Sequence, residues 1–98
     1  MRYAARRDAT HFQLATDLRT LGFSVADTSR MGDSFPDLVL GRAGVDRLVE
    51  IKTLRQRKHV TYAQPRTAGQ QSFADTWRGA PVILAYSLDD ILTAWSNA

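Results

Sequence analysis

Four short stretches of apolar residues have the length and spacing of buried β-strands. They cover residues 23–26, 38–40, 47–53 and 81–86. Pro36, which has no amide proton to give to a strand ladder, suits the start of the second strand. Gly41-Arg42-Ala43-Gly44 separates the second strand from the third, and this composition predicts a turn that joins them as a hairpin. Residues 28–35 are polar and predict a loop.

Three other segments follow the period of an amphipathic α-helix. The first covers residues 8–21, ends at a C-capping Gly22 and carries apolar residues at Phe12, Ala15, Leu18 and Leu21. The second begins with a predicted capping box between Thr67 and Gln70 and ends near Gly79. The third follows the capping segment 87–90 and runs through Trp95. We expect Phe73, Trp77 and Trp95 to pack in the core.

The predicted order is therefore α-β-β-β-α-β-α, with residues 54–66 as a basic loop before the second helix. Continuous apolar strands between amphipathic helices favour the α/β class, with a mixed sheet flanked by helices on both faces. The sequence contains no internal repeat and no low-complexity tract, so residues 1–98 are expected to form a single domain.

Composition narrows the class of protein only slightly. The net charge is +3, the isoelectric point is near 9.8 and cysteine is absent, which excludes disulfides and thiolate zinc sites. No apolar run approaches the ~20 residues of a membrane span, and the basic N-terminus has no apolar segment typical of a secretory signal. We therefore expect a cytoplasmic protein that does not bind membranes.

Three charged residues interrupt the apolar stretches. Asp37 adjoins the second strand, and Glu50 and Lys52 lie in the third. Because side chains alternate along a strand, Glu50 and Lys52 share one face, and a neighbouring strand would bring Asp37 beside them. Burying charges is costly unless they are paired or bind a metal. Two carboxylates and one ammonium at one place predict a metal site suited to phosphodiester hydrolysis.

Mg²⁺ or Mn²⁺ is the expected cofactor, since such ions take one or two carboxylates and further oxygen ligands. Asp37 and Glu50 are the candidate metal ligands, together with the backbone carbonyl of Ile51. Lys52 either orients the attacking water or neutralises charge in the transition state. Taken separately, Glu50-Ile51-Lys52 is more often a solvated strand face, and Pro36-Asp37 more often a turn. Their combination favours the metal site.

Basic residues gather in two further places. Arg55, Arg57, Lys58 and Arg66 follow the charged strand, and Arg6 and Arg7 lie near the N-terminus; all six are candidate nucleic-acid contacts. A solvated loop and a frayed tail explain the two clusters equally well. Tyr62 could stack on a base. The chain has eleven arginines and only two lysines, which makes a lysine at position 52 a distinctive choice.

These residues resemble the signature of the PD-(D/E)XK nucleases. The resemblance is carried by Gly32-Asp33-Ser34-Phe35-Pro36-Asp37-Leu38-Val39 and Val49-Glu50-Ile51-Lys52. Thr67-Ala68-Gly69-Gln70 and Trp77-Arg78-Gly79, followed by a strand, are similar to the VRR-NUC branch, whose small members are often encoded by phages and bacteria. The predicted order of elements is also that of the restriction-endonuclease-like core.

The resemblance implies a divalent-metal nuclease, with Asp37 and Glu50 as metal ligands and Lys52 as the catalytic lysine. It also implies that Gln70 supports the active site or the DNA backbone, although a capping role alone is as good an explanation. Stand-alone members resemble Holliday-junction resolvases and act as homodimers. The implied substrate is therefore branched DNA, and the implied setting is a bacterial or phage-infected cell.

One feature departs from that family. Its members commonly carry an acid in the first helix, where this chain has Gln13; Asp8 or Asp17 are possible substitutes, and the number of metal ions stays open. His11 and His59 are expected to be surface residues. Two other functions are compatible with the sequence. One is a catalytically silent DNA-binding module, and the other is a small structural or inhibitory protein with a charged hairpin.

Overall fold

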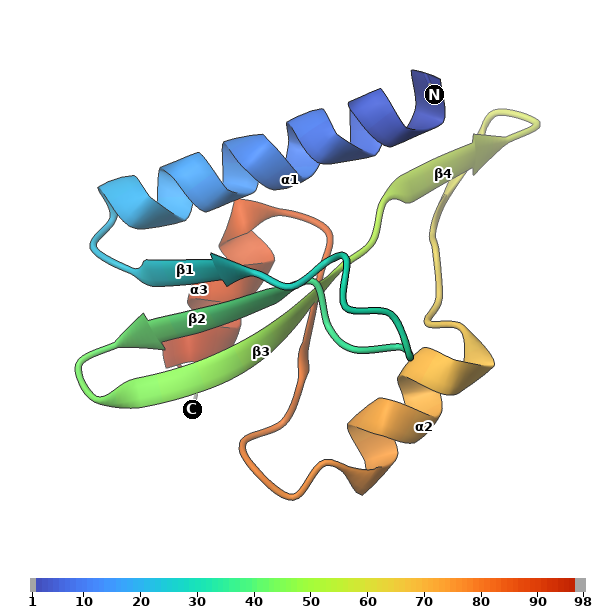
Figure 1. Ribbon diagram of the computed structural model, residues 1–98. Helices are drawn as coiled ribbons and strands as arrows, with labels where there is room; N and C mark the ends of the chain where they lie inside the picture. Colours follow the sequence, from blue (N-terminus) through green and yellow to red (C-terminus); the bar gives the residue numbers. More distant parts are fainter. Residues whose placement is uncertain (1, 97–98) are drawn as a thin grey trace.

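The computed structural model describes the backbone of residues 2–96 and the side chains of residues 10–96. Along the chain its elements are α1 (Arg2–Thr20), β1 (Ser24–Asp27), β2 (Leu38–Arg42), β3 (Val45–Ile51), β4 (Leu54–Arg57), β5 (Val60–Ala63), α2 (Ala68–Thr76), β6 (Ile83–Ala85) and α3 (Leu88–Ser96) (Figure 1). Within the described part of the chain, no helix is long and apolar enough to cross a membrane.

Four strands form a mixed sheet in the order β1-β2-β3-β6. The pairs β1–β2 and β2–β3 are antiparallel, whereas β3 and β6 are parallel. The predicted α/β class, the mixed sheet and the β2–β3 hairpin are confirmed. The parallel pair requires the chain to cross from one end of the sheet to the other, and α2 lies within this crossover.

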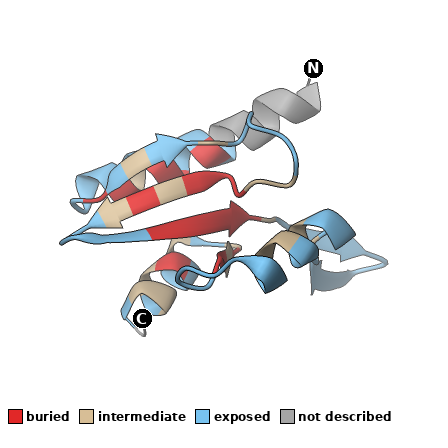
Figure 2. Cartoon of the chain, turned by 60° about the horizontal axis from the view of Figure 1, so that its bottom comes forward, coloured by how far each residue is buried: buried red, intermediate tan, exposed pale blue. Residues whose placement is uncertain are grey.

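The hydrophobic core lies on one face of the sheet. The pairing register opposes Leu38 to Val49, and opposed residues share a face. Leu18 from α1 and Ile91 from α3 pack onto this face and are fully buried, as are Leu38 and Val49 (Figure 2). Each such side chain contributes about 1.5–3 kcal/mol by leaving water. Helices α1 and α3 therefore cover this face.

The buried stripe of α1 differs from the predicted one. Leu14, Ala15 and Leu18 are buried, but Phe12 is 70% exposed and Leu21 is 44% exposed. Apolar residues on a helix recur every three or four positions, so this sequence is compatible with two overlapping apolar stripes. One contains Phe12 and Leu21, and the other contains Leu14. The sheet binds the stripe that contains Leu14, so the expectation for Phe12 and Leu21 was wrong. The helix also begins before residue 8, at Arg2.

Gly22 ends α1 as predicted. Its φ is +94°, a region that a side chain disfavours. Its backbone nitrogen donates to the carbonyl of Arg19 and that of Phe23 donates to Leu18, both at 3.0 Å. This is the Schellman pattern, in which the residue after the glycine packs against the last turn. Phe23 also meets Trp95 edge to face, with ring centroids 4.8 Å apart, so Trp95 packs against the core.

Helix α2 has the predicted capping box at Thr67 and Gln70 but ends at Thr76, before Gly79. None of its residues is buried. Phe73 meets Phe35 edge to face at 5.5 Å and stacks on Trp77 at 5.2 Å. Trp77 is 43% exposed, so its expected place in the core was wrong. The aromatic contacts instead join α2 to the loop before β2.

Residues 54–66 were predicted as a loop, but most of them form the β4–β5 hairpin. The strands lack apolar alternation because they face solvent, so the sequence gives no strand signal there. The β2–β3 turn is also shorter than predicted, with only Ala43 and Gly44 between the strands. Both have positive φ, as do Lys58 and His59 in the β4–β5 turn. Two-residue hairpin turns of this kind match the twist of the strands.

Candidate functional site

Asp37 connects the start of β2 to the end of β3. It directly precedes β2, and its backbone nitrogen donates to the carbonyl of Val49 at 2.9 Å. Its carboxylate Oδ2 accepts a hydrogen bond of 2.7 Å from the backbone nitrogen of Ile51. The side chain is 8% exposed. One carboxylate oxygen of Asp37 is thus fixed at the end of β3 by the main chain.

The loop that leads to Asp37 is fastened to its neighbours by Thr28. The Thr28 nitrogen donates to the Asp37 carbonyl at 2.8 Å, and its hydroxyl donates to the Pro36 carbonyl at 2.7 Å. Pro36 is itself among the fully buried side chains. These contacts hold the backbone of Pro36 and Asp37 rigidly, so the carboxylate has little freedom. The sequence did not single out Thr28.

Glu50 is the most deeply buried acid, with 2% of its surface exposed. Burial, and secondarily the charge of Asp37, raise the pKa of Glu50, whereas Arg66 and Lys52 act in the opposite direction. Because β3 alternates, Glu50 lies on the face opposite to the core residue Val49. The register that pairs Leu38 with Val49 brings Asp37 opposite Glu50, so the β2–β3 hairpin places the two acids on the same face.

Arg66 is the cation paired with Glu50. Its Nε lies 3.9 Å from Glu50 Oε1, and its Nη2 donates to the Val82 carbonyl at 3.1 Å. The Arg66 side chain is only 16% exposed, and its Nε has no hydrogen-bond partner among the described residues. Arg66, predicted as a nucleic-acid contact, thus points into the protein toward the acid pair.

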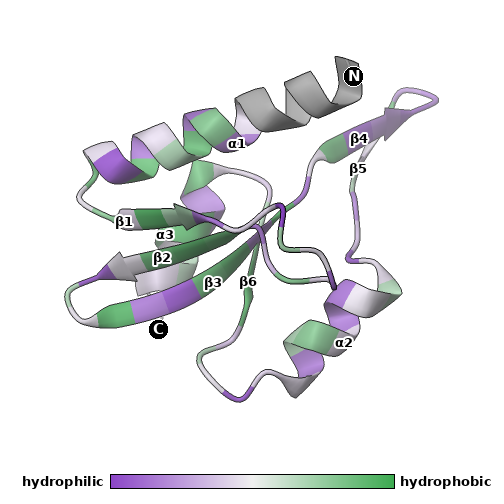
Figure 3. Cartoon of the chain, in the orientation of Figure 1, coloured by the Kyte–Doolittle hydropathy of each residue, from purple (hydrophilic) through white to green (hydrophobic). Residues whose placement is uncertain are grey.

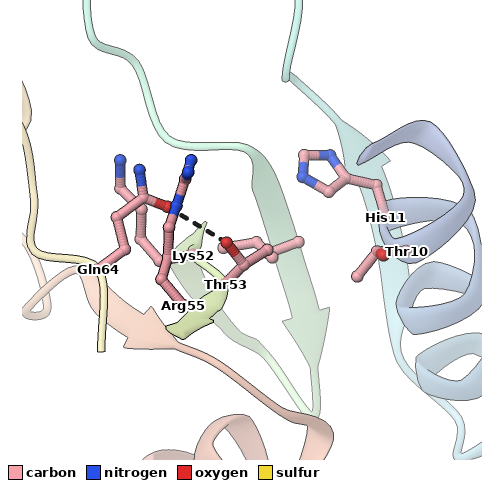
Figure 4. A pocket seen from close by; sticks show the side chains of 7 residues that line it. Thr10, His11, Lys52, Thr53, Arg55 and Gln64 are labelled. Atoms are coloured by element: carbon pink, nitrogen blue, oxygen red, sulfur yellow. Dashed lines mark hydrogen bonds between the residues drawn. The ribbon is translucent and has the colours of Figure 1, made fainter. Parts of the chain in front are cut away.

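Lys52 directly follows β3, and its backbone nitrogen donates to the Ala85 carbonyl at 2.9 Å. It lines a pocket together with Ile51, Thr53, Arg55 and Gln64 on one side and Thr10 and His11 of α1 on the other (Figure 4). The Lys52 side chain is partly exposed. The Lys52 side chain therefore has access to solvent in a pocket that neither Asp37 nor Glu50 lines.

His11 is buried, at 7% exposed, so its predicted surface position was wrong. It lies in the helical stripe of Leu14 and Leu18, a spacing that could have identified it. Gln13 is exposed and donates through Nε2 to Asp17 Oδ1 at 2.9 Å. Its side chain is therefore held on the surface of α1, while His11 lines the Lys52 pocket. The side chain of Asp8 lies outside the described residues.

The amide oxygen of Gln70 accepts a hydrogen bond of 2.9 Å from the Thr67 nitrogen. The Gln70 nitrogen in turn donates to the Thr67 hydroxyl at 3.2 Å. The helix start is packed tightly, since a Cβ at Gly69 would overlap with the Ser34 hydroxyl. Gln70 thus has the capping role that the sequence predicted as one of two explanations, and its amide oxygen is already occupied.

The predicted basic contacts fall into different surroundings. Arg55, Arg57 and Lys58 are exposed on the β4–β5 hairpin, and His59 is exposed at its tip as expected. Arg6 and Arg7 belong to α1, but their side chains lie outside the described residues. The structure thus separates Arg66, near the acids, from the exposed basic residues of the hairpin.

The donor set fits one hard divalent cation. No group of three or more His, Cys, Asp or Glu side chains suited to a metal occurs among the described residues, so protein ligands would be two carboxylates and a carbonyl. The Ile51 nitrogen faces Asp37, and the carbonyl of a strand residue points to the same side as its nitrogen. Two buried acids that repel each other would be stabilised by a cation, and Mg²⁺ needs only one or two carboxylates.

Comparisons of the chain with protein-family models, curated proteins and solved structures found no match.

Proposed function

We propose that this protein is a divalent-metal-dependent DNA endonuclease. The observation that carries the proposal is the pair of buried acids, Asp37 and Glu50, at the end of the β2–β3 hairpin. Lys52 follows Glu50 by two residues, and its positive charge lowers the pKa of Glu50. Burial of two like charges costs stability, and a fold retains such a pair most readily where a cation joins it. The strand order and the mixed sheet are compatible with the restriction-endonuclease-like core.

Each residue has a distinct task in this proposal. Asp37 and Glu50, with the Ile51 carbonyl, would hold Mg²⁺ or Mn²⁺. When bound, the ion supplies an activated water and polarises the scissile phosphate. Lys52 stabilises negative charge on the phosphate from the solvent-accessible side. Arg66 balances the charge of Glu50, and the Thr67–Gln70 capping box fixes the helix that follows Arg66.

We further propose that the substrate is branched or otherwise structured DNA and that two copies act together. The described part of the chain carries one pair of buried acids. Symmetric cleavage of two strands requires two sites related by a twofold axis, the commonest arrangement of homo-oligomers. The choice of branched DNA rests on the motif resemblance to small junction-cleaving nucleases.

A cleavage panel with a charge-matched control variant tests the proposal. Labelled four-way junction, flap, splayed and linear DNA are incubated with Mg²⁺, Mn²⁺, Ca²⁺ or EDTA. We expect Lys52→Met and Glu50→Gln to lose at least ~100-fold in cleavage rate. Arg30→Met, which removes one exposed positive charge outside the proposed site and outside the β4–β5 hairpin, should retain the rate. Undiminished cleavage by Lys52→Met or Glu50→Gln, or cleavage in EDTA, would refute the assignment.

The Glu50–Arg66 contact favours a second candidate, a DNA-binding module without catalysis. A guanidinium 3.9 Å from the carboxylate already neutralises part of the charge that a metal would balance. That module would bind junction DNA without cutting it under any of the ions. It would also show no heat of Mg²⁺ or Mn²⁺ binding in calorimetry. Binding of either ion that is lost in Asp37→Asn decides in favour of the nuclease.

A further inference from the structure

The β4–β5 hairpin forms a two-stranded ribbon that is separate from the main sheet. All eight of its strand residues are exposed (Figure 2). The ribbon projects beyond the end of β3, and β4 becomes hydrophilic toward its tip (Figure 3). A two-stranded hairpin with no packed face is marginally stable by itself in water. The ribbon therefore needs stabilising contacts at its base, and its exposed strands are available to a binding partner.

Support at the base comes from three hydrogen bonds around Gln64. The Gln64 nitrogen donates to the Thr53 carbonyl at 3.2 Å, and the Thr53 hydroxyl donates to Gln64 Oε1 at 3.3 Å. Tyr86 directly follows β6, and its hydroxyl donates to the Gln64 carbonyl at 2.5 Å. The ribbon is thus attached to both β3 and the β6 end of the sheet, while its tip is unsupported.

Positive charge is concentrated on one face of the ribbon and at its tip. The register opposes Arg55 to Tyr62 and Arg57 to Val60, so these four residues share a face. The other face carries the uncharged pairs Leu54–Ala63 and Gln56–Thr61. No acid occurs between residues 53 and 74. Among the described residues, the ion pairs do not include the cations of the ribbon.

The tip is basic at a conformational cost. Lys58 has φ +51° and His59 has φ +66°, a region that is uncommon for lysine and that glycine, asparagine, aspartate and histidine adopt more readily. A two-residue turn of this type prefers Asn-Gly or Asp-Gly. The chain instead has Lys58 and His59 at the tip, so one long cation lies there. A charged tip of this kind suits contact with an anionic surface.

We propose that the β4–β5 ribbon is a docking arm that enters the major groove of duplex DNA; this inference rests on the proposed function. A two-stranded ribbon fits that groove. Four residues per strand extend roughly 13 Å, or about four base pairs along the helix axis. Arg55, Arg57 and Lys58 contact the phosphates that border the groove, and the Tyr62 side chain lies between them.

The attachment of the arm gives the duplex a defined place relative to the acid pair. Only Lys52 and Thr53 separate β3 from β4, and Arg55 lines the same pocket as Lys52 (Figure 4). A duplex that is bound along the ribbon therefore has one end near Lys52, at the base of the ribbon. The substrate that this geometry favours has a double-stranded arm on the ribbon side of the cut.

Binding measurements without cleavage test the arm. The affinity of the protein for a labelled duplex of about 20 base pairs, longer than the ribbon's reach, is measured in EDTA by fluorescence anisotropy. We expect the double variant Arg55→Ser/Arg57→Ser to bind at least tenfold more weakly. The slope of log affinity against log salt should fall by about two. The matched control Arg30→Ser/Arg78→Ser removes the same charge from exposed positions elsewhere and should bind within threefold of the unmodified protein.

Dimethyl sulfate footprinting identifies the groove. Protection of guanine N7, which lies in the major groove, is expected with the unmodified protein and should disappear in the Arg55→Ser/Arg57→Ser variant. Equal weakening in both double variants, or protection confined to adenine N3 in the minor groove, would overturn the proposal. A ribbon that pairs with a second copy instead would be revealed if Leu54→Ser/Val60→Ser abolished self-association in sedimentation while duplex binding stayed intact. That result also overturns the proposal.

The two proposals fail separately. Metal-dependent cleavage that persists in Arg55→Ser/Arg57→Ser with unchanged duplex affinity would remove the arm and leave the nuclease. Ribbon-dependent duplex binding without cleavage under any ion would leave the arm and remove the nuclease.

Discussion

The carboxylate of Glu50 and the guanidinium of Arg66 face each other across 3.9 Å in a nearly solvent-free part of the protein. Their side chains are 2% and 16% exposed. Arg66 is oriented by the carbonyl of Val82, so the contact ties β3 to the segment that leads into β6. An acid pair that would otherwise carry two uncompensated charges is thus partly neutralised.

The pH dependence of stability should reveal the strain on Glu50. Burial and the charge of Asp37 raise the pKa of Glu50 above its ordinary value of 4.5. The folded state therefore holds this proton more tightly than the unfolded state. Stability falls as pH rises from about 4.5 through the folded-state pKa and then levels off. Glu50→Gln lacks this term.

Denaturant titrations of the metal-free protein and of Glu50→Gln, at intervals from about pH 4 to pH 8, check the sign. The stability of Glu50→Gln relative to the unmodified protein should increase with pH across this window. Parallel curves for the two proteins would contradict the expected shift.

Divalent cations should stabilise the fold through the same acids. A ligand that binds only the folded state at ten times its dissociation constant adds about 1.4 kcal/mol, which raises Tm by roughly 5–10 °C in a domain of this size. Thermal melts with increasing Mg²⁺ or Mn²⁺ measure this. Asp37→Asn and Glu50→Gln should show no increase, and Asp75→Asn, an exposed acid on α2, should respond like the unmodified protein. An increase in all four proteins would indicate a nonspecific ion effect.

Gly69 should tolerate no side chain unless Ser34 is also changed. A Cβ at position 69 overlaps with the Ser34 hydroxyl, so Gly69→Ala should push α2 away from the loop before Asp37. We expect a cost of about 1–3 kcal/mol. Ser34 has φ +63°, so Ser34→Gly removes both the obstacle and an unfavourable conformation.

A double-mutant cycle measures this relation by denaturant unfolding. Gly69→Ala in the Ser34→Gly background should cost less than about 0.5 kcal/mol. Strictly additive effects would show that the two residues do not press on each other.

Arg47 allows a test of how a buried cation without an acidic partner affects stability. It is 6% exposed, and its Nη2 donates to the Pro81 carbonyl at 2.8 Å. Its Nε and Nη1 have no hydrogen-bond partner among the described residues. Replacement of buried charges by apolar residues of similar size is often neutral or stabilising. Arg47→Met should therefore unfold at the same or higher denaturant concentration, whereas a loss above about 2 kcal/mol would mean that the guanidinium is well compensated.

Local signals account for the parts of the fold that were predicted correctly. Gly22 and the Thr67–Gln70 pair are identifiable because caps depend on a few neighbouring residues. Phe12 and Trp77 were misplaced because their exposure depends on which stripe the sheet covers. The β4–β5 hairpin was missed because solvent-facing strands need no apolar alternation, and its stability depends on the distant Tyr86.

The residues of the candidate site also fall into two groups: those that local sequence predicts and those whose position depends on distant contacts. Asp37 and Glu50 were predicted to meet because one hairpin joins them, and the β2–β3 register places them opposite each other. The pairing of Arg66 with Glu50 could not be read from the sequence, since the Val82 carbonyl determines where the guanidinium points. His11 was placed on the surface because the predicted stripe of α1 contained Phe12 and Leu21 and not Leu14, with which His11 shares its helical spacing.

The parallel pairing of β3 with β6 should delay the completion of the site during folding. β2 and β3 are joined by a two-residue turn, and β1 is joined to β2 by the loop of residues 28–37, so these three consecutive strands can associate early. β6 joins only after the chain closes a loop that contains β4, β5 and α2, which slows this step. Asp37 and Glu50 therefore meet on the early hairpin before Val82 is in place to orient Arg66. Until then their repulsion is unbalanced, so a divalent cation should speed refolding as well as slow unfolding.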